Sequence, residues 1–171
     1  MVETEFPVEI LSSIPKGTGM LWEKIEQFKE QLSFFEENVT HIAGTEQSKE
    51  MQETYPLKQH LSNGLYTREI FMPAGHLIIS MIHKQSHPSF LLKGRLSYLT
   101  DEGVVETITA PHVVQTQEGA QRVLFIHEDT QWCCVYKTDA KTFEEAEADV
   151  YADNYKELPQ EIIKKRKTWL E

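Results

Sequence analysis

The chain has 171 residues, of which 40% are hydrophobic and 26% are charged, and its formal net charge is -10. This length is sufficient for one hydrophobic core but short for two domains. The excess of acidic residues argues against a nucleic-acid partner, because phosphate contacts require lysines and arginines clustered over a broad face. We therefore expect one compact domain that does not bind nucleic acid.

The ends and the hydrophobic runs of the sequence favour a soluble, cytoplasmic protein. The first ten residues contain three glutamates, where a secretory signal would have basic residues followed by an apolar run. A membrane-spanning helix requires about 18 consecutive apolar residues, and the sequence has no such stretch. We expect no membrane partner.

Residues 1–64 are predicted to form a helical arm and a loop. In the segment 20–39 the apolar residues recur at three- and four-residue steps among Glu, Lys and Gln, which is typical of an amphipathic helix. The apolar side of this helix requires a partner, either its own domain or a second chain. Residues 41–55 are polar and mixed, and we expect a loop or a short helical piece there.

The pattern changes at residue 65 to short runs rich in β-branched and aromatic residues, with turn residues about every ten positions. Short strands without intervening helices predict an antiparallel sandwich, jelly roll or barrel over residues 65–138. Residues 139–171 are predicted to be a helical tail, with helices at 143–151 and 159–170. The expected strands are 66–72, 76–83, 89–93, 95–100, 104–109, 112–116, 121–127 and 131–138, with Glu128 and Asp129 in a hairpin turn.

The order of strands and glycines in this region resembles the cupin family, over something under half of the chain. Cupins have a first motif with two histidines one residue apart, then an acid, then a glycine at a turn. Here Gly94 stands for that glycine, His83 for the second histidine and His87 for the acid, while Met81 replaces the first histidine. Arg122 stands where the second cupin motif has its strand-borne histidine.

This resemblance implies a mainly β fold, an antiparallel jelly-roll barrel, to which the periodicity adds an N-terminal amphipathic helix and C-terminal helices. It also implies an incomplete set of metal ligands. The stretches 66–75, 82–84, 93–94, 110–112 and 127–132 are more closely similar to small cupins encoded by tailed phages and prophages. Most members of that group have no assigned function.

His83 and His87 are candidate metal ligands on chemical grounds as well. His83 ends an apolar strand and His87 follows across a short turn, so both imidazoles could meet on a Zn, Mn, Fe or Ni ion at the barrel mouth. A third ligand has to come from another strand, with His127 or Glu69 as candidates, although strand parity does not favour His127. The alternative is a pair of rim histidines bonded to backbone or solvent.

Arg122 is predicted on the strand face that Leu124 and Ile126 share. If that face is interior, the buried guanidinium requires Glu69 or an anionic group of a ligand. If the strand end is exposed, Arg122 is an ordinary surface side chain. Four aromatic residues with a polar group suit either a ligand pocket or a packed core, namely Tyr66, Tyr98, Trp132 and Tyr136.

Three functions fit these residues. The favoured one is a binding protein, encoded by a phage, that holds and sequesters a small anionic molecule in the barrel. The second is a metal-dependent cupin enzyme, an oxygenase or isomerase, and the third is a virion or assembly accessory protein without a small ligand. Because cupins often pair their barrels across an exposed sheet, we also expect a homodimer.

Overall fold

The structure is a computed structural model that describes residues 21–32, 39–42, 53–100 and 104–166. Strands account for most of the regular structure, as predicted, and none of the helices in these ranges is long and apolar enough to cross a membrane. The strands are β1 (Val39–Ile42), β2 (Leu57–Ser62), β3 (Leu65–Met72), β4 (Leu77–His83), β5 (His87–Leu99), β6 (Val105–Thr109), β7 (His112–Thr116), β8 (Gln121–Lys137) and β9 (Tyr151–Ala152). The helices are α2 (Leu21–Leu32), α4 (Phe143–Val150), the short 3-10 helix η1 (Tyr155–Glu157) and α5 (Gln160–Lys165).

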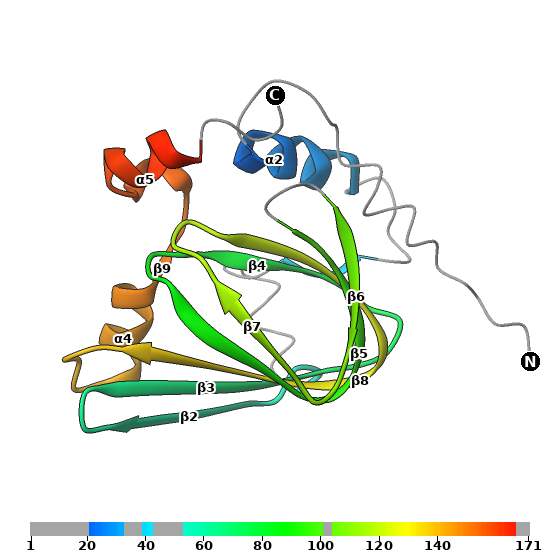
Figure 1. Ribbon diagram of the computed structural model, residues 1–171, viewed down its shortest axis with the longest axis horizontal. Helices are drawn as coiled ribbons and strands as arrows, with labels where there is room; N and C mark the ends of the chain where they lie inside the picture. The colour runs from blue at the N-terminus through cyan, green and yellow to red at the C-terminus, as the bar shows by residue number, and fades with distance from the viewer. Residues whose placement is uncertain (1–20, 33–38, 43–52, 101–103, 167–171) are drawn as a thin grey trace, which may run out of the picture.

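The described strands form one nine-stranded sheet, antiparallel except between β1 and β4. Its main path runs β1-β4-β8-β3-β2, while β5 pairs with β6, β7 and β8, and β9 pairs with β4. The sheet curls around a core that contains the fully buried Tyr66, Leu91, Leu96, Ile126 and Tyr136 (Figure 1). The predicted antiparallel jelly-roll barrel is thereby confirmed.

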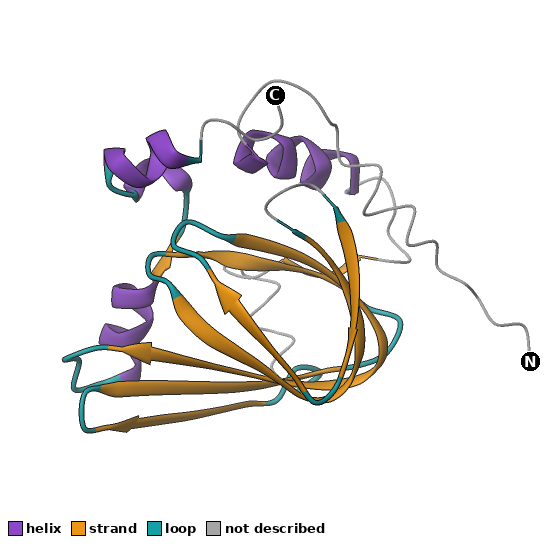
Figure 2. Ribbon diagram, in the orientation of Figure 1, coloured by secondary structure: helices purple, strands orange, loops and turns teal. Residues whose placement is uncertain are grey.

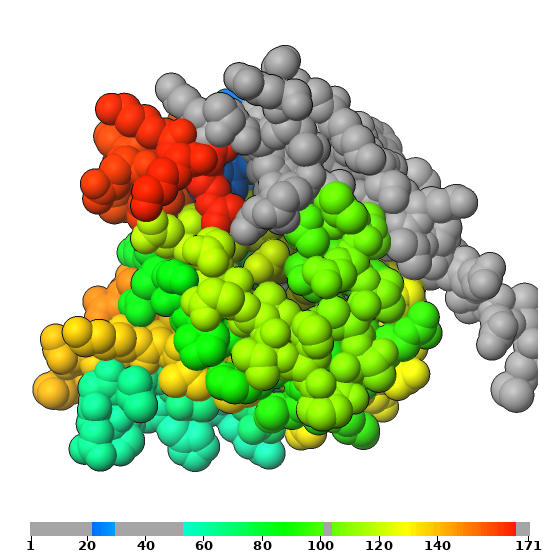
Figure 3. Space-filling view, viewed as in Figure 1, coloured from blue at the N-terminus to red at the C-terminus, as the bar shows by residue number. Residues whose placement is uncertain are grey.

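The helices cover the barrel from two sides. Helices α2 and α5 lie along one side of the sheet, and α4 lies at one end, close to β2 and β9 (Figure 2). In Figure 3 residues of the sheet form the lower and central part of the face toward the viewer, and α5 lies above them. Trp22 of α2 is 2% exposed, donates its indole N–H to the Gly119 carbonyl at 2.8 Å and stacks on Tyr155. Helix α2 therefore packs on its own chain, although residues 33–38 of the predicted helix lie outside the described residues.

The two longest strands correct the predicted boundaries. Strand β8 runs without interruption through Glu128 and Asp129, which were expected in a hairpin turn, and β5 runs through Gly94. The pairing of β5 with β8 shifts register three times between Leu91 and Leu96. Bulges of this kind absorb turn-forming residues while the flanking residues keep their ladder partners. The turn-forming residues Gly94, Glu128 and Asp129 therefore lie at bends within these strands and not at their ends.

The sheet also extends beyond residues 65–138. Strand β2 lies in the segment expected to be arm and loop, and all of its residues are exposed or half-buried. As an edge strand it pairs with β3 alone among the described strands, so its sequence lacks the apolar run of a central strand. Strand β9 follows α4 directly and adds Tyr151 to the edge of β4.

We predict that Gly94→Ala is strongly destabilising. Gly94 has φ of +91°, and a Cβ there would lie 2.5 Å from the Asp129 carbonyl oxygen and 2.6 Å from Thr130 Oγ1. We expect a loss of about 1–2 kcal/mol from backbone strain and about 1–3 kcal/mol more from overpacking. Urea unfolding measures this loss. Gly75→Ala is the control, because Gly75 has φ of +83° and a Cβ added there would have no neighbour within 4 Å. Equal losses in the two variants would show that the contact with β8 is unimportant.

Candidate functional site

A buried group of side chains lies where the end of β4, the start of β5 and the end of β8 meet. His83 is the last residue of β4 and His87 the first of β5, and their ring centroids are 4.7 Å apart. The Tyr136 hydroxyl lies 3.0 Å from His83 Nδ1, and the Tyr136 ring lies 4.1 Å from that of His87. His83 is 6% exposed and His87 2%. The structure thus brings the two predicted histidines together, with Tyr136 between them and the barrel core.

Both imidazoles are neutral at pH 7. Burial lowers the pKa of His83 well below its ordinary value, and the neighbouring His87, Arg122 and Arg68 lower it further. Burial also lowers the pKa of His87; a hydrogen bond to a backbone carbonyl opposes this shift, and Arg122 adds to it. Neutral histidines present one donor nitrogen and one acceptor nitrogen each.

The tautomer of His87 is fixed by its backbone partner. His87 Nδ1 lies 3.0 Å from the Gln85 carbonyl oxygen, which can only accept a hydrogen bond. Nδ1 therefore carries the proton, and Nε2 presents a lone pair. This Nε2 atom is buried and has no hydrogen-bond partner among the described residues. A buried acceptor without a donor is unfavourable, so this position suits a ligand that supplies an O–H or N–H group.

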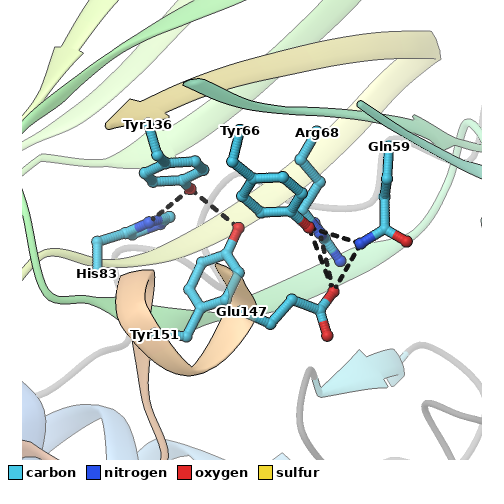
Figure 4. A network of polar contacts seen from close by, with 7 residues as sticks. All are labelled: Gln59, Tyr66, Arg68, His83, Tyr136, Glu147 and Tyr151. Atoms are coloured by element: carbon cyan, nitrogen blue, oxygen red, sulfur yellow. Dashed lines mark hydrogen bonds and ion pairs between the residues drawn. The ribbon is translucent and has the colours of Figure 1, made fainter. Parts of the chain in front are cut away.

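Helix α4 is followed by a second tyrosine of this group, Tyr151, which the sequence analysis did not single out. Thr142 caps the helix by accepting the Glu145 N–H, and the helix ends at Val150. The next residue, Tyr151, pairs with His83 in β9, and its hydroxyl lies 2.9 Å from that of Tyr136. Burial raises the pKa of both tyrosines, so both phenols remain protonated at neutral pH. Figure 4 shows the resulting chain from His83 through Tyr136 to Tyr151.

Arg122 lies inside the barrel, which decides between the two interpretations of its sequence position. It is 7% exposed and shares the interior face of β8 with Leu124 and Ile126, both members of the core. Its Cζ lies 5.1 Å from the centroid of the Tyr98 ring, a cation–π contact. No carboxylate of the described residues, Glu69 included, lies within ion-pair distance of the guanidinium. Arg122 is therefore a buried cation on an aromatic face.

A second arginine, Arg68, belongs to the same interior. It lies on β3 opposite Cys134 of β8, on the face that also carries Tyr66 and Ile70. Its buried Nε atom has no hydrogen-bond partner among the described residues and lies 3.9 Å from Glu147 Oε1. Its Cζ lies 5.6 Å from the Tyr151 ring centroid. Strand alternation places Arg68 on the same face as Tyr66 and Ile70. This pattern could have predicted an interior position for Arg68, just as the corresponding pattern did for Arg122.

The other predicted aromatic residues belong to the same buried core. Tyr98 lies beneath Arg122, and Tyr66 lies beside Arg68 on β3. Trp132 donates its indole N–H to Cys134 Sγ at 3.2 Å, within the core. Tyr98 thus contacts the Arg122 guanidinium and Tyr66 lies next to Arg68. Trp132 is a packed residue of the barrel core.

The predicted third metal ligands do not join His83 and His87. His127 Nε2 lies 2.7 Å from Ser97 Oγ, and its ring packs edge-on against Phe125. Glu69 contacts Lys58 and accepts a hydrogen bond from Gln131. Across the described ranges, no three His, Cys, Asp or Glu side chains converge closely enough to hold a metal ion. The guanidinium groups near His83 also oppose a second cation, so these residues do not fit a three-ligand metal centre.

Comparison with known proteins places cupin-domain structures among those that this chain resembles. No protein-family model matches the sequence, and no curated protein is significantly similar to it. The matching structures include an acetylacetone dioxygenase from Acinetobacter johnsonii, with 22% identity over 48% of this chain and 59% of the dioxygenase chain, at a TM-score of 0.42. They also include a cupin 2 domain-containing protein from Halorhodospira halophila, with 15% identity over 58% of this chain and 72% of that chain, at a TM-score of 0.44. The cupin 2 domain of an XRE family transcriptional regulator from Enterobacter cloacae matches with 13% identity over 51% of this chain and 99% of that one, at a TM-score of 0.43. At these identities the likeness is one of fold alone.

We predict that the protein holds far less than one transition-metal ion per chain. Two neutral histidines without a third ligand bind such ions weakly, and the nearby arginines weaken the site further. Elemental analysis of protein purified without a His tag or a chelator measures the content, beside His83→Ala and His87→Ala. Near-stoichiometric Zn, Mn, Fe or Ni in the parent protein, lost in both variants, would contradict this prediction.

Proposed function

We propose that the barrel binds a small anionic molecule, whose charged group pairs with Arg122. The observation that carries the proposal is the position of Arg122, buried on the interior face of β8 without a carboxylate partner among the described residues. Burying an unpaired charge is one of the most costly changes in a protein interior. A cation–π contact with Tyr98 returns only about 0.5–2 kcal/mol. An anionic ligand would supply the missing charge and charge-assisted hydrogen bonds.

The neighbouring groups narrow the chemistry of this ligand. No described residue donates a hydrogen bond to the buried lone pair of His87 Nε2, so a hydroxyl or amino group on the ligand would supply the missing donor. Tyr136 and Tyr151 hold protonated phenols close to the same place. A hydroxy acid, an amino acid or a protonated phosphate ester combines an anionic group with such a donor. We infer that the ligand belongs to this class.

The biological setting of this binding is part of the proposal. The resemblance to small cupins of tailed phages suggests that the chain is phage-encoded, acts in the cytoplasm of a bacterial host and sequesters its ligand without turnover. The metal-dependent oxygenase or isomerase is less well supported, because the described residues give His83 and His87 no third ligand. The virion or assembly role does not account for the buried Arg122 or for the half-buried Arg68.

We predict that Arg122→Met stabilises the free protein and abolishes its response to the anions that bind at Arg122. Replacing a buried charge by an apolar side chain of similar length is expected to raise the free energy of unfolding by about 1–4 kcal/mol. Thermal unfolding with a panel of hydroxy acids, amino acids, sugar phosphates and nucleotides measures the response to anions. A ligand at 100 times its Kd stabilises the native state by about 2.7 kcal/mol. Parent protein should show such a shift with at least one compound, and Arg122→Met should not.

Arg95→Met is the matched control, because Arg95 is exposed on β5. It should change neither the stability nor the response to anions by more than about 0.5 kcal/mol. If Arg122→Met were destabilised and kept the same anion response as the parent, Arg122 would have a structural role and the proposal would be wrong.

We also propose that the chain forms a homodimer through the outer face of β5 and β7. Leu92 and Val113 are 51% and 61% exposed on these neighbouring strands. Light scattering should give twice the chain mass of 19.9 kDa, and the double variant Leu92→Glu, Val113→Glu should give a single chain mass. Leu65→Glu, an exposed position on β3, is the control and should remain dimeric. A parent protein with the mass of one chain would contradict the dimer.

A further inference from the structure

A carboxylate of α4 is held by hydrogen-bond donors from two strands at the end of the barrel. Glu147 Oε1 accepts a hydrogen bond from Gln59 Nε2 of β2 at 3.1 Å and another from the Tyr66 hydroxyl of β3 at 3.4 Å. Gln59 Nε2 also lies 2.6 Å from the Tyr66 hydroxyl. Arg68 Nε lies 3.9 Å from the same oxygen. Figure 4 shows these groups converging on Glu147 from the barrel side.

The fit of Glu147 to this set of donors is poor. A guanidinium binds a carboxylate best through two parallel hydrogen bonds, one to each oxygen. Here these contacts all reach one oxygen, and the distance from Arg68 Nε exceeds that of a hydrogen bond. Arg68 Nε remains buried without a hydrogen-bond partner among the described residues. The backbone of Glu147 cannot move closer to Arg68, because Ala146 and Val150 of the same helix are buried in the core.

The site is accessible to a ligand without unfolding of the helix. The side chain of Glu147 is 43% exposed and that of Arg68 is 26% exposed. A change of the Glu147 rotamer would free the donors, while Ala146 and Val150 keep α4 on the barrel. The freed site would present one guanidinium, one phenol and one amide N–H, a combination that suits a carboxylate group.

We propose that Arg68, Tyr66 and Gln59 form a second anion site, which takes the carboxylate group of a small ligand, and that Glu147 occupies this site in the free protein. Glu147 is then an internal competitor. It keeps the half-buried guanidinium of Arg68 partly neutralised until a better-fitting carboxylate replaces it. This site is separate from the one at Arg122, since its donors come from β2 and β3 and not from the first half of β8.

The test is a titration with sodium acetate at constant ionic strength, followed by the NMR signals of the arginine Nε–H groups. Glu147→Gln should bind acetate about tenfold more tightly than the parent, because an occupied site lowers the apparent affinity by the fraction of free chains. Glu144→Gln is the matched control. It removes the same charge from an exposed position of α4 and should leave the affinity at the parent value.

Two double variants test whether the gain in acetate affinity of Glu147→Gln comes from the proposed site. Glu147→Gln with Arg68→Met should lose the gain, and Glu147→Gln with Arg122→Met should keep it. Should the Arg68 variant fail to fold, Glu147→Gln with Tyr66→Phe serves instead and should bind acetate several-fold more weakly than Glu147→Gln alone. The proposal is overturned if Glu147→Gln binds acetate no better than Glu144→Gln, or if the gain survives the loss of Arg68.

Discussion

The pairing of β8 with three other strands is the constraint on which the site depends. The first half of β8 pairs with β4, the second half pairs with β3, and β5 pairs along both halves. Arg122 near its start and Tyr136 near its end therefore face one interior, although they are 14 positions apart. The bend that allows this lies where Gly94 crosses Asp129 and Thr130, with no room for a side chain. A fold that shares one strand between its two halves brings distant residues together without loops or hinges.

The interior of this barrel carries positive charge that its described residues do not balance. Arg122 lies on the Tyr98 ring, and Arg68 has one imperfect carboxylate contact. The adjacent imidazoles cannot add negative charge, and their low pKa values keep them from adding positive charge. The result is a buried environment that disfavours cations and favours anions. Departures of this kind from the rules of a stable core are expected at functional sites.

The sequence predicted the architecture better than the boundaries of its elements. Alternation and turn spacing led to a β barrel, because the apolar residues of β4, β5 and β8 mark a shared interior. The continuous course of β8 through Glu128 and Asp129 was not predictable from turn chemistry, since whether such residues end a strand depends on their partners across the sheet. Strand β2 was missed because its pattern is that of an edge.

The same distinction applies to the site. His83, His87 and Arg122 were identified from their places on strands, and parity already indicated that His127 points elsewhere. Tyr151 and Glu147 were not identified from the sequence. Nothing in the local pattern of a helical segment shows that Tyr151 after its end pairs with β4, or that the Glu147 side chain reaches β3. Contacts that depend on how a helix docks are set by tertiary packing, which a single sequence does not reveal.

The resemblance to cupins and the observed charges can be connected through one position. Arg122 stands where the second cupin motif has a histidine, and a guanidinium differs from an imidazole in being always protonated and unable to bind a metal. A metal centre draws anionic ligands because it supplies positive charge in a buried place. A fixed guanidinium in the same barrel would supply that charge from the chain itself, at any physiological pH and without an ion. On this view the proposed preference of the barrel for anionic ligands does not require a metal, and the two histidines are free to act as hydrogen-bonding groups.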